Sequence, residues 1–406
     1  MDNYITSFLN IVKYGVSLTE ILRQEVQRVL NVLLETELTE FLKYAKYDPK
    51  GYNSGNSRNG YYKRTVKSVF GELELAIPRD RKGEFSNKLF SPYQRICYDL
   101  GNEIIQMFKQ GSTIREISKF IKKTYGFFYS PQSVSNITKV LQEEVGKFHK
   151  RQLEKRYIAI CCDATYIPIK RKTVQKEALH VLLGITPDGR KEVLDYAVAA
   201  NENNSTYRQL LENIKERGVE EVLLFVTDGF GHLGMTCNEV FPKAKHQCCW
   251  VHVSRNIRAY VRKSDWNVMA EEVKGIYTAD DKEQATDRMG EYLRKWYSKY
   301  PKLWEKMYDP EELFAFMILP ERIRKSFYTT NALEGLNNLL KRQTRKKEMF
   351  PNENSMERFV CAVYENYNEE QYFKPALFFE ETSIEVSQIF DEVYGVKLNP
   401  EESIYT

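Results

Sequence analysis

The stretch Ile158-Ala-Ile-Cys-Cys-Asp-Ala-Thr-Tyr-Ile167 places a single acid, Asp163, inside an apolar run that is typical of a buried β-strand. Because side chains alternate along a strand, Asp163 shares one face with Cys161 and Thr165. A carboxylate in such a strand is costly to bury without a partner. A metal ion is one adequate partner, and a buried Lys or Arg is the alternative.

Two further acids lie in segments that point to the same kind of site. Val222-Leu-Leu-Phe-Val-Thr-Asp-Gly229 is an apolar run that ends on Asp228, and ligands commonly gather where parallel strands end. A helix N-cap for 230–240 is the alternative role of Asp228. Glu334 lies in the helical pattern Thr329-Thr-Asn-Ala-Leu-Glu-Gly-Leu-Asn-Asn338. Two aspartates on neighbouring strands and a glutamate on a helix are able to hold two divalent cations, and such sites cut and join phosphodiester bonds.

The helix predicted around Glu334 has two different faces, because successive residues turn by ~100°. The polar face consists of Glu334, Asn338, Lys341 and Arg345, and the opposite face of Leu333, Leu336 and Leu340. A carboxylate above an amide and two cationic side chains suits a cation and a phosphate backbone together. Solvated ion pairs are the alternative for this face. A capping box between Asn331 and Glu334 is the alternative for the acid.

The order of predicted elements around these acids is that of a ribonuclease-H-like core with a mixed five-stranded sheet. We predict strands at 157–167, 180–186, 192–199, 222–226 and 246–250, and helices at 205–217, 232–240 and 253–261. Pro187-Asp-Gly189 predicts the turn of a hairpin. Residues 264–320 are helical by pattern and are interpreted as an all-α insertion. Their tryptophans, Trp266, Trp296 and Trp304, with Trp250 just before them, are more typical of a core than of a base-stacking platform.

The N-terminal region predicts an α-rich DNA-binding part. Residues 18–46 form an amphipathic helix pattern, which indicates a packed helix or an oligomer seam. Residues 48–63 are polar and rich in Gly, Asn and Ser, so we expect a loop or a segment ordered by a partner. Residues 65–77 alternate around Gly71 as a hairpin does, and residues 78–83 follow as a basic turn.

Residues 102–143 predict three short helices in a helix-turn-helix arrangement. Ser112 is the expected cap of the second helix, whose inner face would carry Ile114, Ile117, Phe120 and Ile121. Ser130 before Pro131 predicts the start of the third helix. That helix displays Gln132, Ser133, Ser135, Asn136 and Lys139, which are able to reach base edges or phosphates. A small three-helix core without DNA contacts has the same pattern and remains the alternative.

Composition sets broad limits on the class of protein. A chain of 406 residues predicts roughly two to four units. The net charge of +4 does not itself mark a nucleic-acid binder, but basic clusters at 58–67, 79–82, 170–172 and 341–347 flank the candidate acids. Seven cysteines, with adjacent pairs in apolar segments, indicate reduced core residues rather than disulfides. No signal peptide or apolar run of ~20 residues is apparent, so we expect a cytoplasmic protein without a membrane partner.

The segment His246-Gln-Cys-Cys-Trp-Val-His252 has part of the pattern of a zinc site. A structural zinc ion usually takes four protein ligands, and the neighbouring sequence supplies no second Cys/His pair. We therefore interpret Cys249 and His252 as residues that pack or contact DNA close to the acids.

Taken together, these segments resemble the Mutator-type transposases of bacterial insertion sequences over about residues 55–355. The resemblance is carried by Arg58-Asn-Gly60, Ile77-Pro-Arg-Asp-Arg-Lys-Gly83, Glu216-Arg-Gly218, Val226-Thr-Asp-Gly-Phe-Gly-His-Leu233, Phe241-Pro-Lys-Ala-Lys-His-Gln-Cys-Cys-Trp-Val-His252, Arg255-Asn256, Thr329-Thr-Asn-Ala-Leu-Glu334, Asn337, Lys341-Arg-Gln-Thr-Arg345 and Phe350-Pro-Asn352. It implies a ribonuclease-H-like fold with a helical insertion before the catalytic glutamate. Two departures are Tyr207, where the family often has Trp, and Cys248, where a basic residue is common.

The resemblance also implies site residues. The catalytic and metal-binding triad falls on Asp163, Asp228 and Glu334, the Cys-x-x-His motif on Cys249 and His252, and the family's basic residue on Lys341. Residues expected to contact DNA or to support the triad are Cys249, His252, Asn337, Asn338, Lys341, Arg345, Arg58, Arg79, Arg81, Gln132, Ser135, Asn136 and Lys139.

The function expected from these observations is that of a DNA transposase, which would use two Mg²⁺ or Mn²⁺ ions to cut and join DNA at the terminal inverted repeats of its element. Expected partners are double-stranded repeat and target DNA and a second copy of the chain, as a homodimer or larger synaptic complex at the nucleoid. A nuclease or resolvase of the same fold and a domesticated, non-catalytic DNA-binding protein are the alternatives.

The expected organisation has seven parts. They are an N-terminal helical region with a possible role in oligomerisation (1–50), a basic loop and strand pair (51–96), a helix-turn-helix-like domain (97–150), the first part of the core (151–263), the all-helical insertion (264–321), the second part of the core (322–380) and an acidic tail (381–406).

Overall fold

The computed structural model describes residues 18–90, 98–125, 130–171, 173–229, 233–307, 309–347 and 349–395. The chain divides into two compact units. Unit 1 comprises Met1–Phe108 with Ser112–Val140, and unit 2 comprises Lys109–Gly111 with Leu141–Thr406. Within the described ranges, every helix is too short or too polar to span a bilayer.

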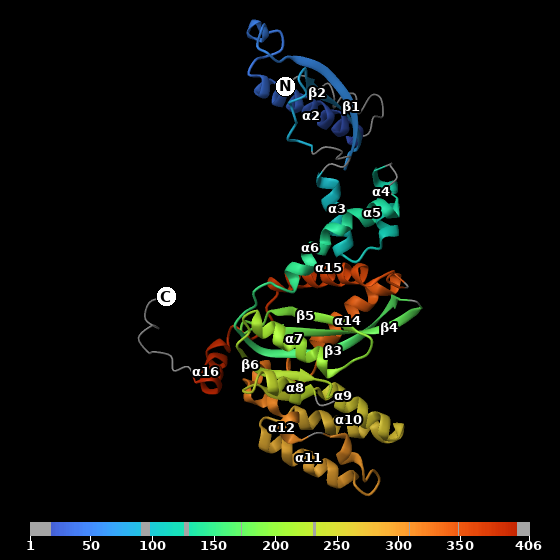
Figure 1. Ribbon diagram of the computed structural model, residues 1–406. Coiled ribbons are helices and arrows are strands. Elements are labelled where there is room, and N and C mark those ends of the chain that lie inside the picture. Colours follow the sequence, from blue (N-terminus) through green and yellow to red (C-terminus); the bar gives the residue numbers. More distant parts are fainter. Residues whose placement is uncertain are drawn as a thin grey trace. The chain divides into compact units, whose positions relative to one another are not determined.

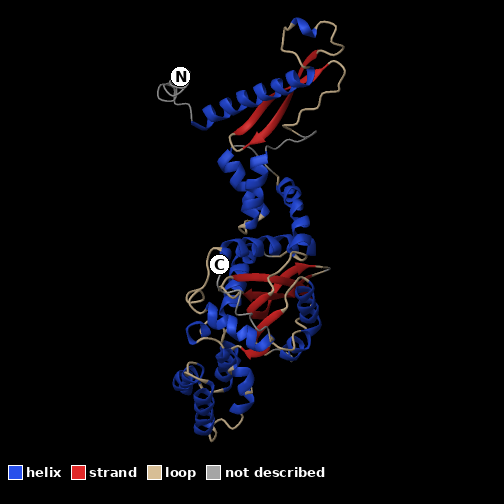
Figure 2. Ribbon diagram, turned by 90° about the vertical axis from the view of Figure 1, so that its left-hand side faces the viewer, coloured by secondary structure: helices blue, strands red, loops and turns tan. Residues whose placement is uncertain are grey.

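Unit 1 begins with a long helix packed on a β-hairpin (Figure 2). Helix α2 (Leu18–Leu42) lies along strands β1 (Arg58–Ser68) and β2 (Gly71–Asp80), which pair antiparallel. Alternate residues of β2 point at the helix and exclude water, which is the main stabilising contribution in so small a unit. The buried core consists of Leu34, Val66, Leu73, Leu75, Ile77 and Phe90.

The hairpin is longer than its sequence pattern predicts. The turn at Gly71 is confirmed, with a φ of 113° that favours glycine. The predicted loop over 48–63 is wrong from Arg58 onward, and the predicted basic turn is wrong for Pro78–Asp80, which belong to β2. Most of the first half of β1 is exposed on both faces, so it has no apolar alternation to mark it. Its pairing with β2 makes it a strand.

Three short helices follow in unit 1, as predicted: α3 (Tyr98–Lys109), α4 (Ile114–Tyr125) and α5 (Pro131–Ile137). A 3₁₀ turn, η2 (Thr138–Val140), continues the third. The predicted cap at Ser130 is confirmed, because its Oγ accepts from the backbone N–H of Ser133 at 3.1 Å.

Two details of α4 differ from the prediction. The cap is Thr113 rather than Ser112: Thr113 Oγ1 accepts from the N–H of Glu116 at 3.1 Å, and the Glu116 carboxylate accepts from the N–H of Thr113 at 2.8 Å. This reciprocal pair is a capping box. Phe120 is 44% exposed and does not belong to the buried face, which is formed by Ile117 and Ile121.

Unit 2 is built on a five-stranded mixed sheet with the order β5-β4-β3-β6-β7 (Figure 1). Its strands are β3 (Arg156–Lys170), β4 (Val174–Ile185), β5 (Lys191–Ala199), β6 (Glu221–Thr227) and β7 (Lys245–Cys248). The first three form an antiparallel meander, and β6 and β7 run parallel to β3. The predicted α/β class, five strands and turn at Gly189 are confirmed, the turn with a φ of 81°.

Helices cover both faces of this sheet. Helices α7 (Asn204–Glu216) and α8 (Leu233–Val240) pack on the face that carries Ile160 and Cys162. Helices α6 (Leu141–Phe148), α14 (Asn331–Thr344) and α15 (Glu353–Tyr372) pack on the other side, where contacts join α14 to β3 and α15 to α6 and β5. Because side chains alternate along β3, Cys161 and Asp163 face this second set of helices.

The segment expected to be an acidic tail includes a helix that packs on the core. Helix α16 (Ser383–Tyr394) buries Val386 and Phe390, and the Tyr394 hydroxyl donates to the carbonyl of Val222 at 2.8 Å. Residues 396–406 of the predicted tail lie outside the described residues.

The predicted all-helical character of 264–320 is confirmed. The segment contains α10 (Lys263–Tyr277), α11 (Lys282–Trp296), the 3₁₀ turn η4 (Leu303–Lys306), α12 (Pro310–Leu313) and the 3₁₀ turn η5 (Ala315–Ile318), and is followed by α13 (Glu321–Arg324). It is joined to the sheet through α9 (Trp250–Tyr260). The predicted strand at 246–250 is therefore wrong at Trp250, which begins a helix.

The tryptophans differ in burial. Trp250 is buried, and its Nε1–H donates to the carbonyl of Leu313 at 2.9 Å. Within the insertion, Trp266 and Trp296 are partly buried, and Trp296 packs against Tyr300, whereas Trp304 is 62% exposed, so the core interpretation is wrong for Trp304.

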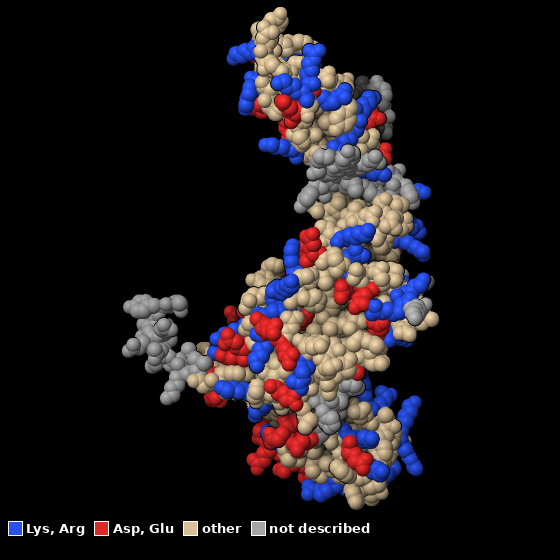
Figure 3. Space-filling view, viewed as in Figure 1, with Lys and Arg blue, Asp and Glu red and all other residues tan. Residues whose placement is uncertain are grey.

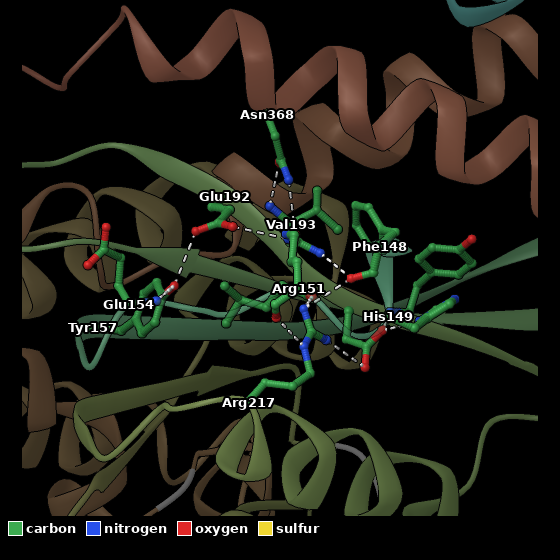
Figure 4. A network of polar contacts seen from close by, with 12 residues as sticks. Phe148, His149, Arg151, Glu154, Tyr157, Glu192, Val193, Arg217 and Asn368 are labelled. Carbon is green, nitrogen blue, oxygen red and sulfur yellow. Dashed lines mark hydrogen bonds and ion pairs between the residues drawn. The ribbon is translucent and has the colours of Figure 1, made fainter. Parts of the chain in front are cut away.

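A polar network fastens α6 and α7 to the sheet (Figure 4). Asp195 on β5 is fully buried and lies 2.5 Å from His149 Nδ1 and 3.3 Å from Arg217 Nη1. Asn213 donates to the same carboxylate at 2.6 Å. Arg217 also donates to the carbonyl of Arg151 at 2.9 Å. The network joins segments distant in sequence, and each buried charge in it depends on the others.

We expect Asp195→Ala to lower the free energy of unfolding of unit 2 by about 3–5 kcal/mol, because it leaves the Arg217 guanidinium buried without its carboxylate. Urea titration followed by tryptophan fluorescence measures this directly, since all four tryptophans belong to unit 2. Asp280→Ala is the matched control, because Asp280 is exposed and its loss should change stability by about 0.5 kcal/mol at most. Equal stabilities of the two variants would contradict the role of the network.

Candidate active site

Asp163, on the inner strand β3, and Asp228, just past the end of the neighbouring inner strand β6, lie side by side at the edge of the sheet where β6 ends. Parallel pairing of β3 with β6 sets Cys161 opposite Val226, and each aspartate lies two residues further along its strand or just past its end. Burial, followed by the nearby Asp228 carboxylate, raises the pKa of Asp163 to about 6. Two carboxylates held this close repel each other, and a cation between them relieves the repulsion.

The helix predicted to carry the third acid is fixed to Asp163 by a hydrogen bond. Asn337 on α14 donates from Nδ2 to Oδ2 of Asp163 at 2.9 Å, across 174 residues of sequence. Its other amide atom, Oδ1, is buried and accepts no hydrogen bond from the described part of the chain. The predicted faces of α14 are confirmed. Leu333, Leu336 and Leu340 are buried, and Asn338, Lys341 and Arg345 are exposed.

Glu334 lies one turn before Asn337 on α14, and its carboxylate forms an ion pair with an arginine. Arg255 Nη1 lies 2.8 Å from Glu334 Oε1, and His252 Nε2 lies 3.9 Å from the same atom. The capping-box alternative is wrong, because the N-cap is Thr330 and makes no side-chain cap. The ligand atoms of Asp163, Asp228 and Glu334 do not all lie within 4.8 Å of one another, because among the described residues the group that meets this limit lies elsewhere.

The Cys-x-x-His segment joins the start of α9 to the start of α14. Cys249 is buried, and the backbone N–H of Thr330 donates to its Sγ at 3.2 Å. His252 lies one turn along α9, and its Nε2 is buried without a hydrogen-bond partner among the described residues. The cysteine therefore packs against the base of the glutamate helix, while the histidine faces the glutamate. The neighbours of Asp163 are thus the amide of Asn337 and the imidazole of His252, and not the buried Lys or Arg considered as the alternative.

Sequence reasoning missed Glu202, a fourth acid at the same edge. Burial first and then the Asp228 carboxylate raise the pKa of Glu202 to about 7, and Tyr207 donates to it at 3.2 Å. The position of Glu202 could have been predicted from the strand topology. Strand β5 runs in the same direction as β3, so an acid three residues after Ala199 lies at the edge where Asp228 lies.

The remaining candidates differ in accessibility. On unit 1, Arg79, Arg81, Gln132, Asn136 and Lys139 are exposed and Ser135 is half-buried. Figure 3 shows Lys and Arg side chains spread over the visible face of the hairpin part. Arg58 differs from these residues, because its guanidinium binds Glu35 at 3.1 Å and Thr39 at 2.8 Å. Arg58 is thus engaged within unit 1, and the expectation of a DNA contact rests on the other residues. The predicted cap role of Asp228 concerns a turn outside the described residues.

The residues present fit hard divalent cations. Asp163, Asp228 and Asn337 Oδ1, which accepts no hydrogen bond from the described residues, supply oxygen donors of the kind that Mg²⁺ and Mn²⁺ prefer, and Glu334 lies one turn away from Asn337 on α14. Burial and then the Asp228 carboxylate raise the pKa of Asp163, and a bound cation would favour its ionised form.

Comparison with known proteins assigns the class to which this fold and site belong. The sequence model described as "Transposase, Mutator family" matches residues 6–374. The chain is 42% identical, over 91% of its length and 95% of the relative's, to the transposase for insertion sequence element IS905 of Lactococcus lactis. It is 41% identical, over 84% and 93%, to the transposase of IS1201 from Lactobacillus helveticus. It is 29% identical, over 89% and 93%, to the transposase of IS256 in transposon Tn4001 from Staphylococcus aureus. The chain belongs to the Mutator family of insertion sequence transposases.

We expect Asp163→Asn to stabilise the metal-free protein at pH 7.5 by roughly 1–3 kcal/mol. A carboxyl whose folded pKa is raised to about 6 contributes stability that is present below its unfolded pKa, near 4, and is lost as pH rises through 6. The asparagine cannot ionise, so the difference from wild type should vanish near pH 4. Denaturant titrations at both pH values, with the exposed Asp287→Asn as control, measure it. A difference that is the same at both pH values would contradict the assigned electrostatics.

Proposed function

We propose that this chain is a DNA transposase that binds the terminal inverted repeats of its insertion sequence and catalyses metal-dependent strand cleavage and strand transfer. The observation that carries the proposal is the placement of Asp163 and Asp228 on adjacent parallel strands, with the helix of Glu334 bonded to Asp163 through Asn337. Family membership supports the same activity.

Topology supports a ribonuclease-H-like core. An antiparallel meander of three strands followed by two strands parallel to the first, in the order β5-β4-β3-β6-β7, is the arrangement expected of that fold. In this arrangement the first and fourth strands in sequence are neighbours, which brings their acids together. The helical insertion lies between the fifth strand and the glutamate helix.

Asp163, Asp228 and Glu334 would hold two Mg²⁺ or Mn²⁺ ions. Bound cations supply the activation of water or a 3′-hydroxyl as nucleophile and the stabilisation of the leaving 3′-oxygen. The protein contributes the fixed position of the acids. Asn337 orients the carboxylate of Asp163, and Glu202, whose pKa is raised to about 7, adds a carboxyl group that a nearby cation would favour in its ionised form.

Cationic side chains around the acids suit a DNA backbone. Arg255 is 57% exposed while it pairs with Glu334, and Lys341 and Arg345 extend the basic face along α14. Neutralised phosphates release counterions, so these residues would contribute affinity without base preference. They would position the scissile phosphate beside the carboxylates, and they distinguish this edge from the remainder of the sheet.

Recognition of the repeats is assigned to α5 of unit 1. Its N-terminus is capped by Ser130, and its exposed side chains Gln132 and Asn136 lie one turn apart and bond each other at 3.1 Å. Amide side chains read adenine in the major groove, which suits a helix-turn-helix. Because both ends of an element must be paired before joining, we expect at least a homodimer on DNA, acting at the nucleoid.

The central test uses a DNA fragment that ends in the element's inverted repeat, with Mg²⁺ and the purified protein. Asp163→Asn, Asp228→Asn and Glu334→Gln should each reduce strand cleavage at least about a thousandfold while repeat binding persists. Glu202→Gln should reduce it less, by about tenfold, and shift its pH dependence. Asp287→Asn, an exposed site on α11, is the matched control.

The outcomes separate the alternatives. Cleavage that survives in Asp163→Asn would refute the assigned site. Cleavage without joining would favour a nuclease or resolvase. Repeat binding without cleavage by the wild type would favour a non-catalytic DNA-binding protein.

Substitutions on α5 and on the turn η2 that continues it test the assigned recognition helix. Asn136→Ala should lower the preference for repeat over random DNA by about 1–3 kcal/mol, because it removes contacts to base edges. Lys139→Ala should weaken binding to both DNAs about equally and reduce the salt dependence by about one ion. Fluorescence anisotropy at several salt concentrations distinguishes the two effects. Unchanged preference in Asn136→Ala together with Gln132→Ala would exclude α5 as the reading helix.

A further inference from the structure

A second cluster of metal-binding side chains lies apart from the carboxylates. The Nδ1 or Nε2 of His246, the Sγ of Cys248 and a carboxylate oxygen of Glu312 all lie within 4.8 Å of one another. Among the described residues, this is the one group of three such side chains that meets this distance. It joins two parts of unit 2, because His246 and Cys248 belong to β7 and Glu312 to α12 of the insertion.

Strand geometry explains why two members converge and why their sequence neighbours do not. Residues two apart on a strand point to the same side, so His246 and Cys248 both face the insertion. Cys249 and His252 lie beyond the end of β7 and face Thr330 and Glu334 instead. The zinc-like pattern of the sequence is therefore split between two places. The third ligand comes from Glu312, 66 residues after His246.

The imidazole is held in position for coordination. Thr227 Oγ1 lies 2.8 Å from His246 Nε2, and Glu312 Oε1 lies 3.1 Å from Nδ1. A hydrogen bond at one ring nitrogen fixes the orientation of the other, as at many metal-binding histidines. Gly234 lies against the same ring, and a Cβ there would come within 2.4 Å of Nδ1. A side chain at this position would displace the imidazole, so the backbone leaves room for the ring.

The cluster has one open side. His246 is 8% exposed and Cys248 is fully buried, whereas the Glu312 side chain is 42% exposed. An ion would reach the ligands past the glutamate, and a water molecule would complete its coordination there. Three protein ligands and one water form the tetrahedral set of zinc sites that keep one open position, whereas closed structural sites usually have four protein ligands.

We propose that His246, Cys248 and Glu312 bind a zinc ion that clamps the helical insertion to the edge strand of the catalytic sheet. Nitrogen, sulfur and oxygen donors together suit Zn²⁺, whereas Mg²⁺ and Ca²⁺ prefer oxygen alone. A thiolate and a carboxylate balance the two positive charges of the ion, and binding releases the thiol proton to water. The inference is independent of the proposed strand-transfer activity.

The clamp would act next to the catalytic residues. β7 continues through Cys249 into α9, whose His252 and Arg255 face Glu334. Fixing β7 to α12 would therefore restrict the motion of the insertion relative to the helix that supports the glutamate.

The test uses the full-length protein stripped of metal and titrated with Zn²⁺ or Co²⁺ alone. We expect one tightly bound Zn²⁺ per chain and a thiolate-to-cobalt charge-transfer band. Cys248→Ser should abolish the band, and Glu312→Gln, at a half-exposed site, should weaken binding at least about tenfold. Cys361→Ser is the control for loss of a buried thiol elsewhere. Asp163→Asn combined with Asp228→Asn removes the carboxylate site and should leave the band unchanged.

Cys248→Ser also separates the ion from the packing. Because the hydroxyl replaces the thiol at nearly the same volume in a fully buried position, the variant should lose the ion and keep the insertion attached, so its melting temperature without metal should stay close to that of the wild type. Added Zn²⁺ should raise the melting temperature of the wild type only. No band in the wild type, or zinc binding that survives in both Cys248→Ser and Glu312→Gln, would overturn the proposal.

Discussion

The hydrogen bond from Asn337 to Asp163 is the contact on which the arrangement of the site depends. It joins α14 to the central strand across 174 residues and sets the Glu334 turn above the sheet edge. The leucine face of α14 supplies burial but no direction along the strand, because apolar contact is non-directional. The hydrogen bond from the Asn337 side chain supplies that direction. The two adjacent aspartates and the helix that carries Glu334 are thereby held in one arrangement.

Several acidic side chains lie close together around this contact, and their mutual repulsion opposes folding. Burial and mutual repulsion raise the pKa of Asp163 to about 6 and that of Glu202 to about 7. Sites that sacrifice stability in this way are typical of function rather than packing. Arg255 partly offsets the charge by pairing with Glu334 at 2.8 Å. The protein alone thus holds its acids in a state that added cations would stabilise.

One short segment contacts both the insertion and the glutamate helix because a strand becomes a helix within it. Along β7, His246 and Cys248 point toward α12, whereas Cys249 and His252 at the start of α9 point toward α14. The insertion and the glutamate helix are therefore attached to neighbouring residues of the same segment.

Elements whose signal is local could be predicted from the residue pattern alone. The apolar run of β6, the leucine face of α14 and the cap at Ser130 follow from periodicity and short-range hydrogen bonds, and the two aspartates were found from the strands that carry them. Contacts between distant residues could not be predicted in this way and became visible in the fold: Asn337 with Asp163, Glu202 near Asp228, Glu312 with the β7 pair, and the exposed half of β1 with β2. Local patterns encode the faces of helices and strands, whereas the partner of a polar side chain depends on the path of the whole chain.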